Sequence, residues 1–304
     1  MPEQYIERRK TRSEFAEIRG LNYHLHVWGR SSMVTPTRPA IIMLHGWMDV
    51  GASFQFIVDA MEQDRYIVAP DWRGFGLTES PRTDSYWFAD YLGDLDALSD
   101  LISPQQPFDL VGHSMGGNVA MMYAGVRAQR VRRLVNLEGF GMSPTQPEDA
   151  PKRLTEWLDQ LKQPARFRDY DSIDAVAKRM RDNNPRLPPE RAYWLAGHWA
   201  RATPQGRWVL NADAVHRRTN PILARREEAI AIWSRITARM LWVEGSDDAL
   251  SRFWRGTYPR EDFEARMAVV PHVERLVIEN AGHMMHHDEP LVLAQHMERF
   301  LDQR

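Results

Sequence analysis

The stretch Gly112-His113-Ser114-Met115-Gly116 says most about the fold of this chain. It follows the apolar run Phe108-Asp109-Leu110-Val111, which is typical of a buried strand, and precedes residues 117–123, whose pattern predicts a helix. So sharp a reversal from strand to helix strains the serine backbone, and glycine on either side leaves room for it. This G-x-S-x-G segment therefore predicts an elbow that lifts the Ser114 hydroxyl clear of a sheet, rather than an ordinary glycine turn.

Composition limits the classes to which the protein can belong. Its 304 residues are 43% hydrophobic and include 11 tryptophans, enough for a sizeable core. The net charge of −2 gives no overall field that would attract nucleic acid or an anionic membrane. The absence of cysteine excludes disulfides, thiolate metal sites and cysteine nucleophiles. Residues 1–10 lack the apolar region of a secretory leader, and no apolar run reaches about 18 residues, so we expect a soluble, cytoplasmic protein without a membrane partner.

Strand and helix patterns alternate along most of the chain. Strands are predicted at 21–28, 40–44, 66–70, 108–111, 131–137, 239–243 and 275–279, with helices at 53–61, 87–102, 117–123 and 290–301. Strands separated by helices predict an α/β fold with a mostly parallel central sheet. After Gly139 the alternation stops, and the next 85 or so residues show helical spacing. We therefore expect a core of residues 1–138 and 236–304, interrupted by a helical cap over 139–235.

A serine hydroxyl near neutral pH needs a general base, and the base needs a carboxylate to orient it. The strongest base candidate is His283, in Asn280-Ala281-Gly282-His283, because it follows the last predicted strand and so falls at the same sheet edge as Ser114. His286 and His287 lie close by and could compete. These three histidines do not have the H-E-x-x-H spacing of a zinc site, and we expect no metal.

Three carboxylates are candidates for orienting the base. Asp247 and Asp248 follow the predicted strand 239–243, and Glu138 ends the strand 131–137. Order and position favour Asp248, with Glu138 as the alternative. A buried carboxylate at the imidazole Nδ1–H selects the tautomer and stabilises the imidazolium.

An oxyanion hole needs two N–H donors. The elbow supplies the Met115 N–H, and the loop His45-Gly46-Trp47-Met48-Asp49, after the strand 40–44, should supply the Trp47 N–H. The later segment Asp71-Trp72-Arg73-Gly74-Phe75-Gly76 is expected to be a structural turn.

Together these motifs resemble the α/β-hydrolase superfamily. The resemblance covers about 25–302 and includes His45-Gly46, Gly112-x-Ser114-x-Gly116, Gly245-x-x-Asp248 and Gly282-His283, in the family's order of serine, acid and histidine. It implies the α/β-hydrolase fold with a cap inserted after the sixth strand, and it is nearest to the serine hydrolase-like and carboxylesterase branch. Some dehalogenases of this superfamily take their acid from the strand end where Glu138 stands.

The identity of the nucleophile and of the loop after the strand 40–44 distinguishes branches of this superfamily. Haloalkane dehalogenases and epoxide hydrolases resemble this chain in His45-Gly46-Trp47, but they use a carboxylate nucleophile, whose ester intermediate water can cleave. Ser114 attacking an alkyl carbon would leave an ether, so acyl transfer is favoured. The family's carbon–carbon hydrolases usually carry a loop rich in glycine and proline, from which Trp47-Met48-Asp49 departs.

The sequence therefore predicts a cofactor-independent serine hydrolase whose partner is a small-molecule ester with a largely apolar body. The alternatives are cleavage of a carbon–carbon bond in a β-diketone-like substrate and a slow-turnover ligand receptor on the same fold. The cap carries 17 Lys and Arg against 12 Asp and Glu, which would suit an anionic acyl substrate but is also typical of a solvated helical surface. The substrate and the oligomeric state stay open.

Overall fold

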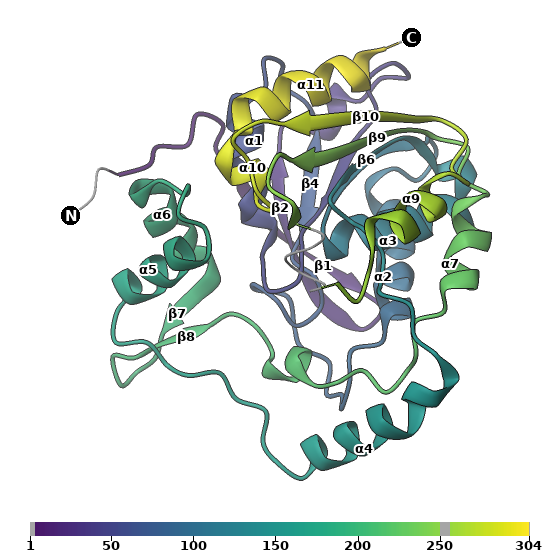
Figure 1. Cartoon of the computed structure of the whole chain (residues 1–304). Helices are drawn as coiled ribbons and strands as arrows, with labels where there is room; N and C mark the ends of the chain where they lie inside the picture. The colour runs from purple at the N-terminus through teal and green to yellow at the C-terminus, as the bar shows by residue number, and fades with distance from the viewer. Residues whose placement is uncertain (1–3, 250–255, 304) are drawn as a thin grey trace.

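A computed structural model describes residues 4–249 and 256–303 of the chain (Figure 1). Its main element is an eight-stranded sheet with the order β1-β2-β4-β3-β5-β6-β9-β10. The pairs β1–β2 and β2–β4 are antiparallel, and all other neighbours are parallel. The strands are β1 (Arg12–Ile18), β2 (Leu21–Trp28), β3 (Ile41–Leu44), β4 (Ile67–Pro70), β5 (Phe108–His113), β6 (Val131–Leu137), β9 (Arg239–Gly245) and β10 (Val273–Ile278).

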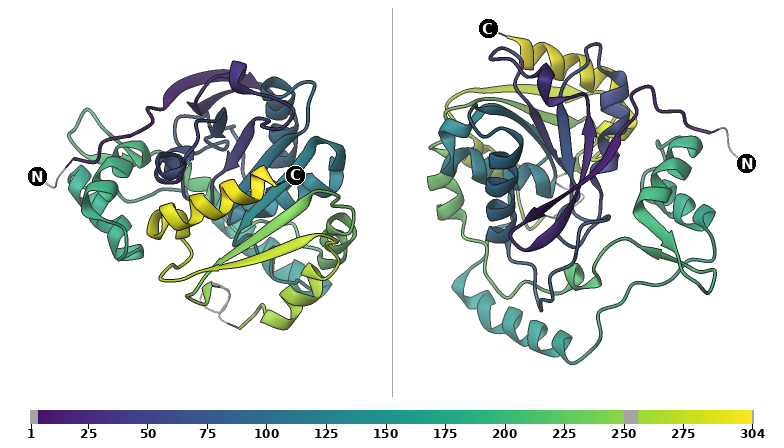
Figure 2. Two further views of the ribbon diagram at one scale, coloured as in Figure 1. Left: turned by 90° about the horizontal axis from the view of Figure 1, so that it is seen from above. Right: turned by 180° about the vertical axis from the view of Figure 1, so that it is seen from behind.

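Helices cover both faces of this sheet (Figures 1 and 2). One face packs on α1 (Gln55–Ala60), α10 (Met285–Asp288) and α11 (Pro290–Asp302). The other packs on α2 (Phe88–Ile102), α3 (Met115–Val126), α7 (Arg226–Trp233) and α9 (Arg260–Met267). This layered, mostly parallel sheet confirms the predicted fold class. The short 3₁₀ helices are Ser31–Met33, Gly51–Phe54, Ala128–Arg130, Pro147–Asp149 and Ala214–Arg217.

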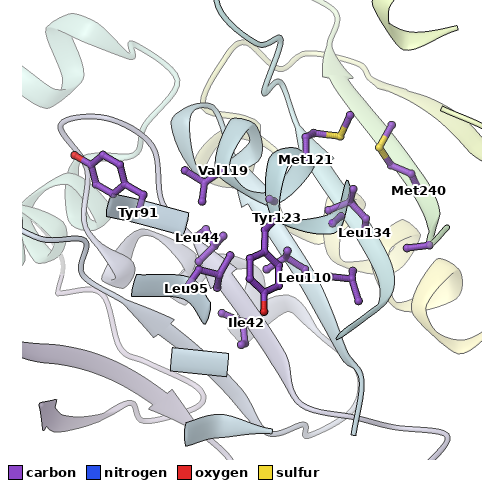
Figure 3. Packing of buried hydrophobic residues seen from close by; sticks show 14 of the residues in the cluster. Ile42, Leu44, Tyr91, Leu95, Leu110, Val119, Met121, Tyr123, Leu134 and Met240 are labelled. Atoms are coloured by element: carbon purple, nitrogen blue, oxygen red, sulfur yellow. The ribbon is translucent and has the colours of Figure 1, made fainter. Parts of the chain in front are cut away.

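The core follows the period of two that strands impose on their side chains. Leu110 and Leu134 point to the face that carries α2 and α3, whereas their neighbours Val111 and Val135 point to the face that carries α11. Figure 3 shows the first of these clusters, in which Leu110 and Leu134 lie near Tyr123 of α3. Burial on both faces explains why the central strands read as continuous apolar runs.

The segment 139–235 is only partly what the sequence predicted. It contains α4 (Ala150–Leu161), α5 (Ile173–Asn183), α6 (Pro189–Trp199) and α7, but also the antiparallel pair β7 (Ala200–Ala202) and β8 (Trp208–Leu210). The expectation of a wholly helical segment was therefore wrong, because three-residue strands are too short to show a period. In Figure 1, α5, α6, β7 and β8 lie together on one side of the molecule, and α4 lies apart from them.

Helix α7 packs against the main body rather than with α5 and α6. Gly125 of α3 lies so close to α7 that an added Cβ would overlap the backbone carbonyl of Ile232. Trp233 is fully buried in the same cluster as Trp242 of β9. The end of the segment 139–235 is thus anchored on α3, and the domain boundaries proposed from the sequence stay a prediction.

Strand β1 was not foreseen either. Its side chains are mostly exposed, and it is the edge strand that pairs only with β2. An edge strand whose side chains are mostly exposed to solvent does not need alternating apolar and polar residues, so the sequence pattern did not indicate a strand here. None of the helices in the described part of the chain is long and apolar enough to cross a membrane.

Candidate active site

Ser114 stands at the turn between β5 and α3 with the backbone angles φ 52° and ψ −114°. A side chain in this left-handed region is strained, and the neighbouring glycines make the turn feasible. A Cβ on Gly116 would overlap the backbone of Leu44, and a Cβ on Gly112 would overlap that of Gly116. The Ser114 N–H donates to the Leu137 carbonyl over 2.9 Å. The elbow predicted from the sequence is confirmed as a backbone geometry.

His283 follows β10 and meets a carboxylate from β6. Its Nδ1 lies 2.7 Å from Oε2 of Glu138, whose side chain is buried. Oε1 of the same carboxylate accepts the Gly245 N–H over 2.8 Å. With Nδ1–H donating to Glu138, the lone pair of the imidazole is left on Nε2, which is the tautomer a general base requires.

Of the candidate carboxylates, the structure brings the alternative, Glu138, to the imidazole of His283, and which of them orients the base stays a prediction. Asp248 has a side chain that is 58% exposed and lies 3.8 Å from Arg260. Asp247, its neighbour, pairs with Arg186 over 2.8 Å. The imidazole has a single Nδ1–H, and the alternative candidate Glu138 receives it. Glu138 reaches this position because its backbone turns at φ 51° directly after β6, one strand away from Gly245.

The two proposed oxyanion donors flank the serine. A Cβ built on Gly46 would lie 3.3 Å from the Ser114 Cβ, which places the loop that carries Trp47 against the elbow. Within residues 4–249 and 256–303, neither the Trp47 N–H nor the Met115 N–H donates a hydrogen bond. Two unsatisfied amides next to a serine hydroxyl suit an oxyanion, although the role itself stays a prediction.

Two cavities open on the serine, and Trp47, Ser114 and His283 line both. The smaller cavity, of about 400 Å³, is mainly apolar and is lined by Tyr86, Phe88, Tyr91, Met115, Phe140 and Met142, among others. The larger cavity, of about 670 Å³, has apolar walls from the segment 139–235 and carries Arg168, Arg179 and Arg217. We refer to them as the apolar cavity and the arginine cavity.

Most of the aromatic side chains of the segment 139–235 do not line these cavities. Trp199 borders the arginine cavity, whereas Trp194 and Trp208 pack in the cluster formed by α5, α6 and β8. Trp157 donates its Nε1–H to Ser85 over 2.8 Å. Trp194 and Trp208 thus contribute to the segment's own core.

Sequence reasoning missed His113, the residue before the serine. Its ring is buried, and its Nε2–H donates to the His283 carbonyl oxygen over 2.8 Å. Burial lowers the pKa of His113 well below its ordinary value, so the ring is neutral. His113 therefore fixes the loop that carries His283. Only its place in the x of G-x-S-x-G could have drawn attention to it.

The expected structural turn at Asp71–Gly76 is confirmed. Asp71 is buried and accepts hydrogen bonds from the Gly51 and Leu77 amides and from His24. Arg73 makes a two-pronged ion pair with the fully buried Asp94, with both contacts at 2.6 Å. These bonds hold the turn in place against the neighbouring strands and helix.

Comparisons with known proteins agree with this fold. A family model described as the alpha/beta hydrolase family matches residues 41–296. A serine hydrolase-like protein of Danio rerio is 27% identical over 259 residues, which are 81% of this chain and 75% of that protein. Epoxide hydrolase 2 of Siraitia grosvenorii is 35% identical over 120 residues, but these are 39% of this chain and 35% of that protein.

Solved structures resemble the whole chain. A thioesterase domain from the curacin biosynthetic pathway is 25% identical and superposes with a TM-score of 0.81, covering 95% of this chain and 99% of that one. An esterase from Mycobacterium tuberculosis is 18% identical with a TM-score of 0.70, covering 97% and 92%. The second likeness shows a shared fold.

Proposed function

This chain belongs to the α/β hydrolase family, and we propose that it is a serine hydrolase that cleaves a carboxylic ester through an acyl-enzyme on Ser114. The observation that carries the proposal is the contact between His283 and the buried Glu138, beside a serine in an elbow. The substrate class that suits the apolar cavity is small to medium and largely apolar.

The proposed reaction has two halves. Ser114 Oγ attacks the carbonyl carbon while His283 Nε2 takes the hydroxyl proton, and the oxyanion is held by the N–H groups of Met115 and Trp47. The proton then passes to the leaving alcohol, and the carbon–oxygen bond breaks. Water attacks the acyl-enzyme with His283 again as base, which releases the acid and restores Ser114. Glu138 stabilises the imidazolium in both halves.

A thioester is a second candidate for the same site. The same acyl-enzyme forms when the leaving group is a thiol, and the thioesterase domain described above is similar over nearly its whole length. The likeness to an epoxide hydrolase carries less weight. Attack by Ser114 on an alkyl carbon would leave an ether that water cannot cleave.

The test is hydrolysis of p-nitrophenyl esters and matched acyl thioesters of increasing chain length by the wild type and Ser114→Ala. We expect a length-dependent rate that falls by at least about 10³-fold in the variant, because the nucleophile is lost. Hydrolysis that survives in Ser114→Ala would show that the serine is not the nucleophile. No turnover of any ester or thioester by the wild type would favour a carbon–carbon substrate or a ligand receptor.

A further inference from the structure

Three buried side chains meet directly below the candidate active site. Asp49, His113 and His286 each offer one ligand atom, and these atoms lie within 4.8 Å of one another. Their exposed fractions are 3%, 2% and 0%. Asp49 Oδ2, His113 Nδ1 and both ring nitrogens of His286 have no hydrogen-bond partner among the described residues. Unpartnered polar atoms at such depth are rare, because each costs the free energy of its lost hydration.

In two of the three side chains, His113 and Asp49, another polar atom is held by hydrogen bonds and the unpartnered atom is left free. The Nε2–H of His113 donates to the His283 carbonyl, which leaves a bare lone pair on His113 Nδ1. On Asp49 the other oxygen, Oδ1, accepts hydrogen bonds from the Ser53 hydroxyl, the Val50 N–H and the Trp199 indole N–H. Asp49 Oδ2 lies 3.7 Å from His286 Nε2, which is too long for a hydrogen bond.

We propose that Asp49, His113 and His286 form a binding site for a divalent transition-metal ion such as Zn²⁺. Two neutral imidazoles and one carboxylate are a ligand set that Zn²⁺ accepts, with a water molecule as the fourth ligand. Ligand bonds of about 2.0–2.2 Å require the three atoms to close in by about 1 Å, within the reach of small side-chain rotations. A metal ligand whose second polar atom is hydrogen-bonded elsewhere is the usual arrangement, and both Asp49 and His113 show it.

The access route also suits a cation. Asp49 and His113 also line the arginine cavity, together with Ser114. An ion can therefore reach the site through the same cavity as a substrate.

The site lies where an ion would affect hydrolysis. The rings of His113 and His283 lie 4.7 Å apart between centroids. A bound dication would disfavour the imidazolium that forms on His283 in the transition state, since like charges at such short range repel in a buried site. We expect bound Zn²⁺ to lower kcat by about tenfold or more. This effect on turnover rests on the proposed function, whereas binding of the ion does not.

The experiment is a titration of the full chain, free of any histidine tag and treated with chelator, with Co²⁺ and with Zn²⁺. Co²⁺ absorption in the visible range reports coordination, and metal analysis after gel filtration gives the number of ions bound. The variants are Asp49→Asn, which keeps the shape and the Oδ1 acceptor, and His286→Gln. The controls are His272→Ala, at an exposed histidine, and His26→Asn, in the other buried histidine and aspartate cluster.

We expect the wild type to bind one Co²⁺ with the intense visible bands of a four-coordinate site. Asp49→Asn and His286→Gln should each weaken binding by at least about 100-fold, because even loss of an outer contact costs 10–100-fold. Ser114→Ala, which removes the proposed nucleophile, should bind the ion as the wild type does. The test of metal binding is therefore independent of whether the protein hydrolyses esters.

Two results would overturn the proposal. The first is that the wild type binds less than about 0.2 equivalents of Co²⁺ or Zn²⁺ at a tenfold excess of the metal, although its thermal transition shows that it is folded. The other is equal binding by Asp49→Asn, His286→Gln and the wild type, or a loss only in His26→Asn, which would place the ion elsewhere. Thermal unfolding of every variant shows whether a loss of binding reflects loss of the fold.

Discussion

Replacing Glu138 by glutamine tests which carboxylate orients His283. The carboxylate accepts two hydrogen bonds, one from the Gly245 N–H and one from His283 Nδ1. Glutamine has one acceptor oxygen, and only that oxygen can satisfy the Gly245 N–H. The amide NH₂ then faces His283, which must present a lone pair at Nδ1 and carry its proton on Nε2. In that tautomer the ring cannot take the proton of Ser114.

The expected loss in Glu138→Gln is about 10³–10⁴-fold in kcat, or about 4–5.5 kcal/mol of transition-state stabilisation. KM should change little, since Glu138 orients the base rather than gripping the ester. The assay is the steady-state hydrolysis of the best p-nitrophenyl ester from the length series, measured between pH 6 and 9. The matched control is Asp248→Asn, at an exposed side chain that pairs with Arg260. We expect its kcat to stay within about threefold of the wild type.

The reverse pattern would refute this reasoning. If Asp248→Asn lost about 10³-fold and Glu138→Gln stayed near the wild type, Asp248 would be the orienting acid after a rearrangement of its loop. Circular dichroism and thermal unfolding of Glu138→Gln separate a catalytic loss from a folding defect, because the side chain is buried.

Four further substitutions test the helix packing, a buried ion pair and a buried histidine. In urea unfolding, Gly125→Ala should lower the free energy of unfolding by about 1–3 kcal/mol, because the new methyl group meets the backbone of α7. In the matched variant Gly197→Ala the new Cβ has no atom within 4 Å, and the free energy of unfolding should rise by roughly 0.5–1 kcal/mol. Arg73→Ala should cost about 3 kcal/mol in the same assay, because the fully buried Asp94 loses a two-pronged partner, and a loss under about 1 kcal/mol would contradict that account. His216 is stacked between two aromatic rings, and burial lowers its pKa to about 3. In the unfolded chain His216 takes up a proton near its ordinary pKa of about 6.5, whereas in the folded chain it does so only near pH 3. The free energy of unfolding therefore falls as the pH drops through this range. His216→Gln should reduce the fall in urea midpoint between pH 7 and pH 5, and an unchanged fall would refute this assignment.

Local patterns of residues were enough to predict most of the individual strands and helices of the core. The apolar run 108–111 and the glycines around Ser114 were enough to predict the strand, the elbow and the helix that follows, because a strand-to-helix reversal permits few residue types. The position of His283 after the last strand was likewise readable, since the carboxyl ends of parallel strands share one edge of the sheet. The fold class followed from the alternation of the same patterns.

Which groups meet at that edge depends on the packing of the whole chain. Asp248 and Glu138 both stand at strand ends, and their spacing in the sequence does not say which one reaches His283. The backbone turn at Glu138 and the neighbouring amide of Gly245 bring that carboxylate to the imidazole, whereas the loop after β9 points Asp248 toward Arg260. The packing of α7 on α3 also depends on contacts far apart in the chain.

The cluster of Asp49, His113 and His286 is the clearest case of a contact that the sequence pattern does not reveal. These residues come from a loop after β3, from the end of β5 and from α10, and none of them stands in a spacing that suggests a shared site. Local pattern specifies how each segment folds and which face it buries. The meeting of three polar side chains inside the fold depends on the order of the strands and on the course of the loops between them, and these are properties of the packed chain.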